Sequence, residues 1–179
     1  TPASAQEGTV RVPLSSWEAL TRPGASQTPA AHAFSQARVG VVITETGDAV
    51  TAEVTVEASV EVLGAALTAV PIASAGTPIG SITAGGREVG LSARGGQLVW
   101  VTEQRGTHAL RWTYRADVRR FGGGRVLSLE TPPSVAQLTL TVPGEDRGVT
   151  VIPASAIAVT PTGDQTRVTA TLPASGGAQ

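Results

Sequence analysis

The chain has 179 residues, 41% of them hydrophobic, and its 13 basic and 14 acidic residues leave a formal net charge of −1. This balance creates no long-range positive field, so nucleic-acid binding is not expected. The absence of cysteine excludes disulfides, thiolate metal ligands and cysteine nucleophiles. No apolar run approaches the roughly 20 residues of a membrane-spanning helix. All basic residues are arginine, a bias typical of a GC-rich genome.

Residues 1–33 are expected to form a leader that precedes the folded body. Residues 3–5, Ala-Ser-Ala, have the small-x-small spacing of a secretory cleavage site, and a simple polar leader is the alternative. A capping-box pattern that begins at Ser15 predicts one short helix over residues 16–21. Residues 174–179 are rich in Gly, Ala and Ser, which indicates a linker-like tail.

From Gln36 onward, hydrophobic residues recur at every second position, which is typical of strands with one buried face. A turn at Thr46 and Gly47 would join the first two strands into a hairpin. If these are the two central turn residues, Val41 lies opposite Ala52, and all apolar side chains of the hairpin share one face.

A second hairpin is predicted around a three-residue loop at residues 104–106. This loop would place Trp100 opposite Leu110, with Trp112 and Tyr114 on the same apolar face. These large aromatic side chains are therefore expected in the core.

A glycine-rich tip at residues 121–124 predicts a third hairpin, in which Arg120 pairs with Arg125. Gly, Pro and Asp turn signals bound five further predicted strands: 87–93, 135–142, 149–152, 157–160 and 167–172. The pattern predicts an all-β fold, an antiparallel β-sandwich of roughly ten strands with one short N-terminal helix. We expect a single domain over residues 34–173.

Arginines supply the most distinctive charge pattern. Five of them lie on one predicted strand and its glycine-rich tip: Arg111, Arg115, Arg119, Arg120 and Arg125. Three glutamates repeat with the same four-residue spacing: Glu53, Glu57 and Glu61. The two strands could therefore lie antiparallel with opposite charges in register. The alternative is that the arginines contact another molecule, such as a protein, an acidic glycan or a lipid head group.

Aromatic and histidine residues are further candidates for a site. Trp17 is expected to cover one end of the sandwich, and a one-residue slip would expose Trp100 as a platform for carbohydrate. His32 and His108 are the two histidines, and neither belongs to a recognisable catalytic motif. We therefore predict no catalytic residue, no metal ligand and no cofactor.

These patterns favour a non-catalytic structural or interaction module of a bacterial envelope or secreted protein, located outside the cytoplasm. Its expected partner is a protein or an envelope component. A carbohydrate-binding module and a surface subunit that self-assembles by strand addition are the alternatives. An enzyme would require one of the histidines to lie beside a carboxylate in a cleft.

Overall fold

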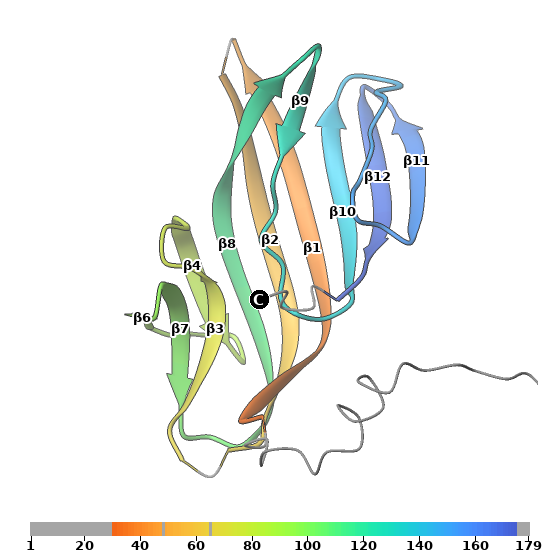
Figure 1. Cartoon of the computed structure of the whole chain (residues 1–179). Coiled ribbons are helices and arrows are strands. Elements are labelled where there is room, and N and C mark those ends of the chain that lie inside the picture. Colours follow the sequence, from red (N-terminus) through yellow and green to blue (C-terminus); the bar gives the residue numbers. More distant parts are fainter. Residues whose placement is uncertain (1–29, 48, 65, 175–179) are drawn as a thin grey trace, which may run out of the picture.

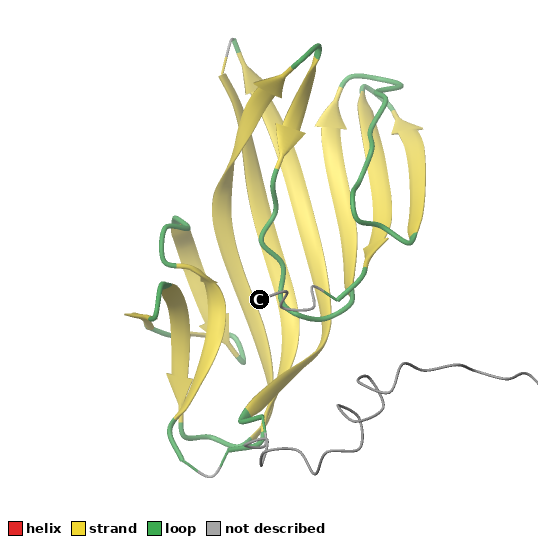
Figure 2. Cartoon of the chain, viewed as in Figure 1, coloured by secondary structure: helices red, strands yellow, loops and turns green. Residues whose placement is uncertain are grey.

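The computed structural model describes residues 30–47, 49–64 and 66–174, and this part contains strands and loops but no helix (Figure 2). The strands are β1 (His32–Thr46), β2 (Ala49–Val62), β3 (Thr68–Ser74), β4 (Ile79–Ala84), β5 (Arg87–Glu88), β6 (Leu91–Arg94), β7 (Gln97–Thr102), β8 (Gly106–Phe121), β9 (Gly124–Leu127), β10 (Ala136–Pro143), β11 (Ala156–Thr162) and β12 (Gln165–Leu172). The all-β prediction is confirmed. The predicted helix at 16–21 and the linker-like residues 175–179 lie outside the described residues.

The strands form two sheets. The larger one has nine strands in the order β11-β12-β10-β1-β2-β8-β4-β5, with β9 paired to β8, and the smaller one has the order β3-β7-β6. Figure 1 shows β1, β2 and β8 as the long central strands, with β10 to β12 on one side and the small sheet on the other. The expectation of purely antiparallel pairing is wrong at one place, because β1 and β10 run parallel. The long connection between these two strands permits that direction.

Alternation places the hydrophobic side chains of the large sheet on one face, here called the core face. A single row crosses the sheet through Ala170, Leu138, Val39, Val56, Trp112 and Ile82, which are paired from strand to strand. All six are buried, with Val56 at 0% exposure. The period-two pattern therefore identified the buried side chains correctly.

Three parts of the chain cover the core face. The small sheet contributes Val70 and Trp100 to the common hydrophobic core. The segment 128–135 is held by Tyr114, whose hydroxyl donates to the Glu130 carbonyl and accepts from the Glu130 amide, each at 3.0 Å. The segment 144–155 packs Val149 and Val151 against the core. The opposite face, here called the outer face, has no such covering element among the described residues.

The turn between β1 and β2 differs from the prediction by one residue. Thr46 pairs with Ala49, so the turn begins at Gly47 and not at Thr46, and Val41 lies opposite Val54 instead of Ala52. Gly47 has a φ of 59°, a conformation that a β-branched residue such as Thr46 would adopt only with strain. Each partner moves by two positions, so the apolar face is the same in both registers.

The predicted hairpin around residues 104–106 does not form. Trp100 on β7 pairs with Val70 and Leu91 in the small sheet, whereas β8 pairs with β2 and β4 in the large one. The connection crosses from one sheet to the other, and the Arg105 side chain fixes it by donating from Nε to the Gly64 carbonyl at 2.9 Å. Strand β8 forms its longest ladder with β2. In this ladder apolar residues lie opposite apolar residues, and two arginines lie opposite glutamates.

The third hairpin is confirmed, with Arg120 paired to Arg125 and Val118 to Leu127. The predicted strand at 149–152 is instead part of the covering segment. Strands β3 and β4 were not predicted, because Pro71 and Gly80 interrupt the alternation of apolar and polar residues. Both residues lie at an irregularity in the pairing of their strand.

Candidate interaction surface

The candidate surface is the outer face of the large sheet, where β2 and β8 lie side by side. Their register places Glu57 opposite Arg111 and Glu53 opposite Arg115, so the predicted alignment of opposite charges is confirmed. The Arg111 Nη1 atom lies 3.7 Å from Glu57 Oε1, and these side chains are 62% and 49% exposed. Solvent screens such a pair, so it helps to set register and contributes little to stability.

The third glutamate has a different partner. Glu61 lies opposite Thr107, whose hydroxyl donates a hydrogen bond to Glu61 Oε2. Arg119 lies further along β8, beyond the end of β2 pairing, and is opposite Val126 on β9. The four-residue spacing therefore predicted two of the three charge alignments.

Arg38 is a member of this surface that the sequence reasoning missed. It lies on β1 opposite Glu57, so one row of the outer face reads Arg38, Glu57, Arg111. The predicted turn would have placed Arg38 opposite Thr55, and only the observed turn reveals the row. A shallow hollow lies over these three residues, and Gln36, Ser59 and Thr83 also line it.

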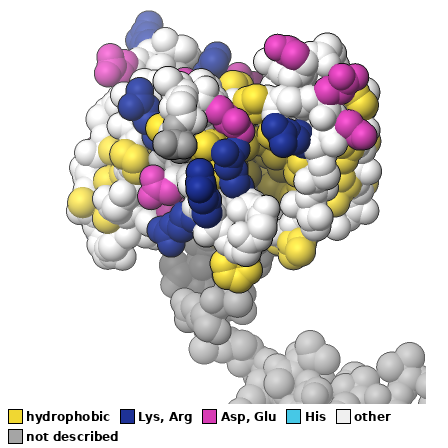
Figure 3. Space-filling model, turned by 90° about the horizontal axis from the view of Figure 1, so that it is seen from above, with side chains coloured by type: hydrophobic (Ala, Val, Ile, Leu, Met, Phe, Trp, Pro, Cys, Tyr) yellow, Lys and Arg dark blue, Asp and Glu magenta, His cyan; other side chains and the backbone are white. Residues whose placement is uncertain are grey.

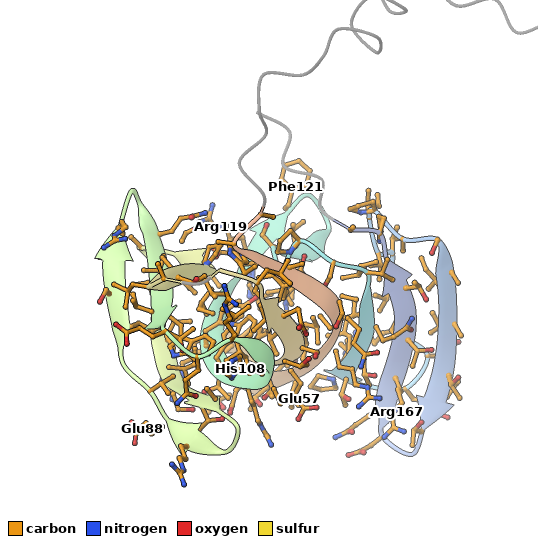
Figure 4. All side chains as sticks on the ribbon, turned by 90° about the horizontal axis from the view of Figure 1, so that it is seen from below. Glu57, Glu88, His108, Arg119, Phe121 and Arg167 are labelled. Carbon is orange, nitrogen blue, oxygen red and sulfur yellow. The ribbon has the colours of Figure 1, made fainter. Side chains whose placement is uncertain are left out.

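The outer face extends to the C-terminal strands. Arg167 on β12 is opposite Thr141 on β10, which is opposite Val42 on β1, so Arg167 shares a row with Glu53 and Arg115. Figure 4, which looks along the strands, shows Glu57 and Arg167 on the same side of the molecule. The outer face is thus a broad polar surface of threonine, arginine and glutamate side chains.

The tip of the β8–β9 hairpin carries Arg120 and Arg125 together with Phe121, which is 78% exposed. Arg125 forms an ion pair with Glu45 of β1, which ties the hairpin to the central strands. Viewed from the end of the molecule that carries this tip, arginine side chains gather near a hollow in which hydrophobic side chains are visible (Figure 3). This tip and the outer face are separate parts of the surface.

The tryptophans offer no exposed platform in the described part of the chain. Trp100 is 6% exposed, and its ring meets that of His108 edge to face with centroids 5.2 Å apart. Trp100 is therefore buried as the core interpretation predicted, although through a different strand pairing. Trp17 lies outside the described residues.

The two histidines have different environments. Burial lowers the pKa of His32, and its Nδ1 atom is buried with no hydrogen-bond partner in the described structure. His108 donates from Nε2 to the Gln104 carbonyl at 2.9 Å. Within residues 30–47, 49–64 and 66–174, no group of three His, Asp or Glu side chains could hold a metal ion, and no helix is long and apolar enough to cross a membrane.

No protein-family model and no curated protein sequence matches the chain. Solved structures do resemble it. An M1 zinc metallopeptidase from Deinococcus radiodurans superposes with a TM-score of 0.52 at 12% identity, over 79% of this chain and 39% of that one. A variant of a two-domain M1 zinc metallopeptidase bound to L-tryptophan gives a TM-score of 0.51 at 15% identity over the same shares. The chain thus spans 39% of the length of these enzymes, and at such low identity the likeness concerns the fold alone.

Proposed function

We propose that the chain is a non-catalytic interaction module of a bacterial envelope or secreted protein, and that its outer face binds a protein partner. The observation that carries this proposal is the contrast between the two faces of the large sheet. Three segments cover the core face, whereas no element within residues 30–47, 49–64 and 66–174 covers the outer face, which presents the Arg38, Glu57, Arg111 row.

The chemistry of this face suits a polar protein surface. Arginine is enriched in protein interfaces, and alternating charges provide specificity more than affinity. The long strands hold Arg111 and Arg115 on a rigid support, so these side chains meet a partner with little reorganisation of the backbone. A partner with acidic groups spaced like Glu53 and Glu57 would compete for the same arginines.

The structural neighbours add one consideration. This fold covers 39% of the two-domain metallopeptidase chain, so it can form part of a longer protein. The proposal for this chain is accordingly a supporting domain that contacts another part of its assembly, with no peptidase activity of its own.

Site-specific photocrosslinking in cells of the source organism tests the binding surface. A photoreactive amino acid at Thr113 or Thr139, both on the outer face, should give one discrete crosslinked product. The same group at Ile152, which is 86% exposed in the segment covering the core face, serves as the control. Arg111→Glu combined with Arg115→Glu should abolish the product. Equal crosslinking from Ile152, or no effect of the charge reversals, would contradict the proposal.

A hydrolysis assay tests the non-catalytic part. The purified chain is expected to cleave chromogenic aminoacyl substrates no faster than buffer does. Activity that disappears on replacing His32 or His108 with alanine would show that the chain is an enzyme after all.

A further inference from the structure

The edge strands of the two sheets differ in how they are protected against pairing with another chain. Four of them carry features that discourage strand addition. β5 has two residues, both charged, and β6 has four, including Arg94. β9 also has four, including Arg125, and β3 contains Pro71 next to a register shift.

Strand β11 is longer than β5, β6 and β9 and carries no charge, and its protection is a single proline. Its seven residues, Ala156 to Thr162, are all exposed, none is charged, and they pair with β12 without a register shift. Ile157 and Val159, 44% and 43% exposed, lie opposite Ala170 and Val168, so they are on the core-face side of the sheet. Pro161 is the one protective feature of the strand: like Pro71 in β3, it has no backbone donor to offer to an added strand. An uncharged, regular edge of this length is a template for another strand.

We infer that β11 pairs with β11 of a second copy of the chain, in antiparallel orientation about a two-fold axis at Val159. This register pairs all seven residues of each strand, and each Pro161 leaves out one main-chain hydrogen bond to Ile157 of the other copy. It places Val159 opposite its own equivalent, Ile157 opposite Pro161, and Ala158 opposite Thr160. Directly opposite residues share a face, so the apolar side chains of both copies meet on the core-face side.

The charges near this edge are compatible with the same register. Arg167 is the charged residue of β12 that lies beside β11, opposite Thr160. In the dimer, the row of paired residues that contains Arg167 and Thr160 continues through Ala158 and Thr169, both of the second copy. The two Arg167 side chains therefore lie in different rows. Asp164 lies at the turn between β11 and β12, and antiparallel pairing moves the two turns to opposite ends of the interface. No like charges are opposed.

The pairing should be weak. A seven-residue edge buries much less than the roughly 1,200 Å² of a stable interface, and main-chain hydrogen bonds supply most of the affinity. We therefore expect a dimer whose population rises with concentration through the micromolar to millimolar range. This inference concerns a different surface from the proposed function, so either one can fail without the other.

Sedimentation velocity at concentrations from about 10 μM to 1 mM, with amide hydrogen exchange alongside, is the first test. The average mass should rise with concentration, while exchange at Ile157 and Val159 becomes slower. Val159→Lys and Val159→Glu each place like charges opposite each other, so each should weaken dimerisation roughly tenfold. Ser92→Lys on the β6 edge is the matched control and should have no effect. A monomer throughout, or equal dimerisation by Val159→Lys, would overturn the inference.

Mixing the variants tests the register itself. A mixture of Val159→Lys and Val159→Glu should recover dimerisation, because the introduced charges face each other across the axis. Ile157→Lys should dimerise more strongly with Pro161→Glu than with Pro161→Gln, which restores the backbone donor without the charge, and should gain nothing from Ile157→Glu. Rescue of Ile157→Lys by Ile157→Glu instead would overturn the assigned axis. Far-ultraviolet circular dichroism and thermal melting confirm that each variant is folded before it is compared.

Discussion

Tyr114→Phe is expected to destabilise the protein by about 2 kcal/mol, because it removes a hydroxyl that satisfies two backbone groups. The Tyr114 hydroxyl donates to the Glu130 carbonyl and accepts from the Glu130 amide, each at 3.0 Å. The tyrosine is buried, and the segment 128–135 shields this point of the core. Losing the hydroxyl leaves both Glu130 groups without this partner, which costs roughly 1–3 kcal/mol.

The same residue makes stability depend on pH in a predictable direction. Burial raises the pKa of Tyr114 from 10.0 to about 12. Below pH 10 the phenol is protonated in both the folded and the unfolded chain, and its contribution is fully present. As the pH rises from 10 toward 12, unfolding releases a proton, so the free energy of unfolding falls by about 1.4 kcal/mol per pH unit, about 3 kcal/mol in all.

This window is unusually free of other titrations. The sequence contains one tyrosine, no cysteine and no lysine, and arginine stays charged to higher pH. Urea unfolding at pH 8, 10 and 11.5 measures the stability, and phenolate absorbance reports Tyr114 alone. Thr113→Val is the matched control, because Thr113 is the next residue on β8 and its hydroxyl meets Ser81 on the outer face. A phenol that titrates near pH 10, or an equal loss of stability in Thr113→Val, would refute the reasoning.

Three further experiments test the packing and the surface by urea unfolding. A double-mutant cycle of Glu57→Gln and Arg111→Gln should give a coupling of at most about 0.5 kcal/mol, and 2 kcal/mol would show a desolvated pair. Trp112→Ala should cost about 3–5 kcal/mol, and a loss below 1 kcal/mol would contradict its place in the core. Gly64→Ala should cost roughly 1–3 kcal/mol, because the new Cβ would lie 2.6 Å from Thr68 Oγ1. Thr68→Ala should relieve most of that cost, and an undiminished cost would refute the clash.

Local alternation predicted which side chains are buried, but not always which strand they face. Val39, Val56 and Trp112 fill the core because period two fixes the face of a strand regardless of its neighbours. Trp100 is buried as well, yet its partners are Val70 and Leu91 and not Leu110. Apolar matching could not distinguish these pairings, because both bury the indole.

Charges gave better information about pairing than apolar residues did. The repeats of glutamate on β2 and arginine on β8 identified two strands that are far apart in sequence as neighbours. Arg38 was missed because its place in the row depends on the turn at Gly47, where one residue of difference changes every partner. The parallel contact of β1 with β10 left no local signal, since neither a turn nor a charge repeat marks it.

That parallel contact divides the large sheet into two parts, which are expected to form at different stages of folding. The central strands are joined through β1 and β2 by a tight turn, whereas the C-terminal strands attach to them through the six residue pairs between β1 and β10. Closing this contact spans about a hundred residues of chain, so it should be among the late steps of folding. Under mechanical load or in mild denaturant, β10, β11 and β12 should separate first as a cooperative unit.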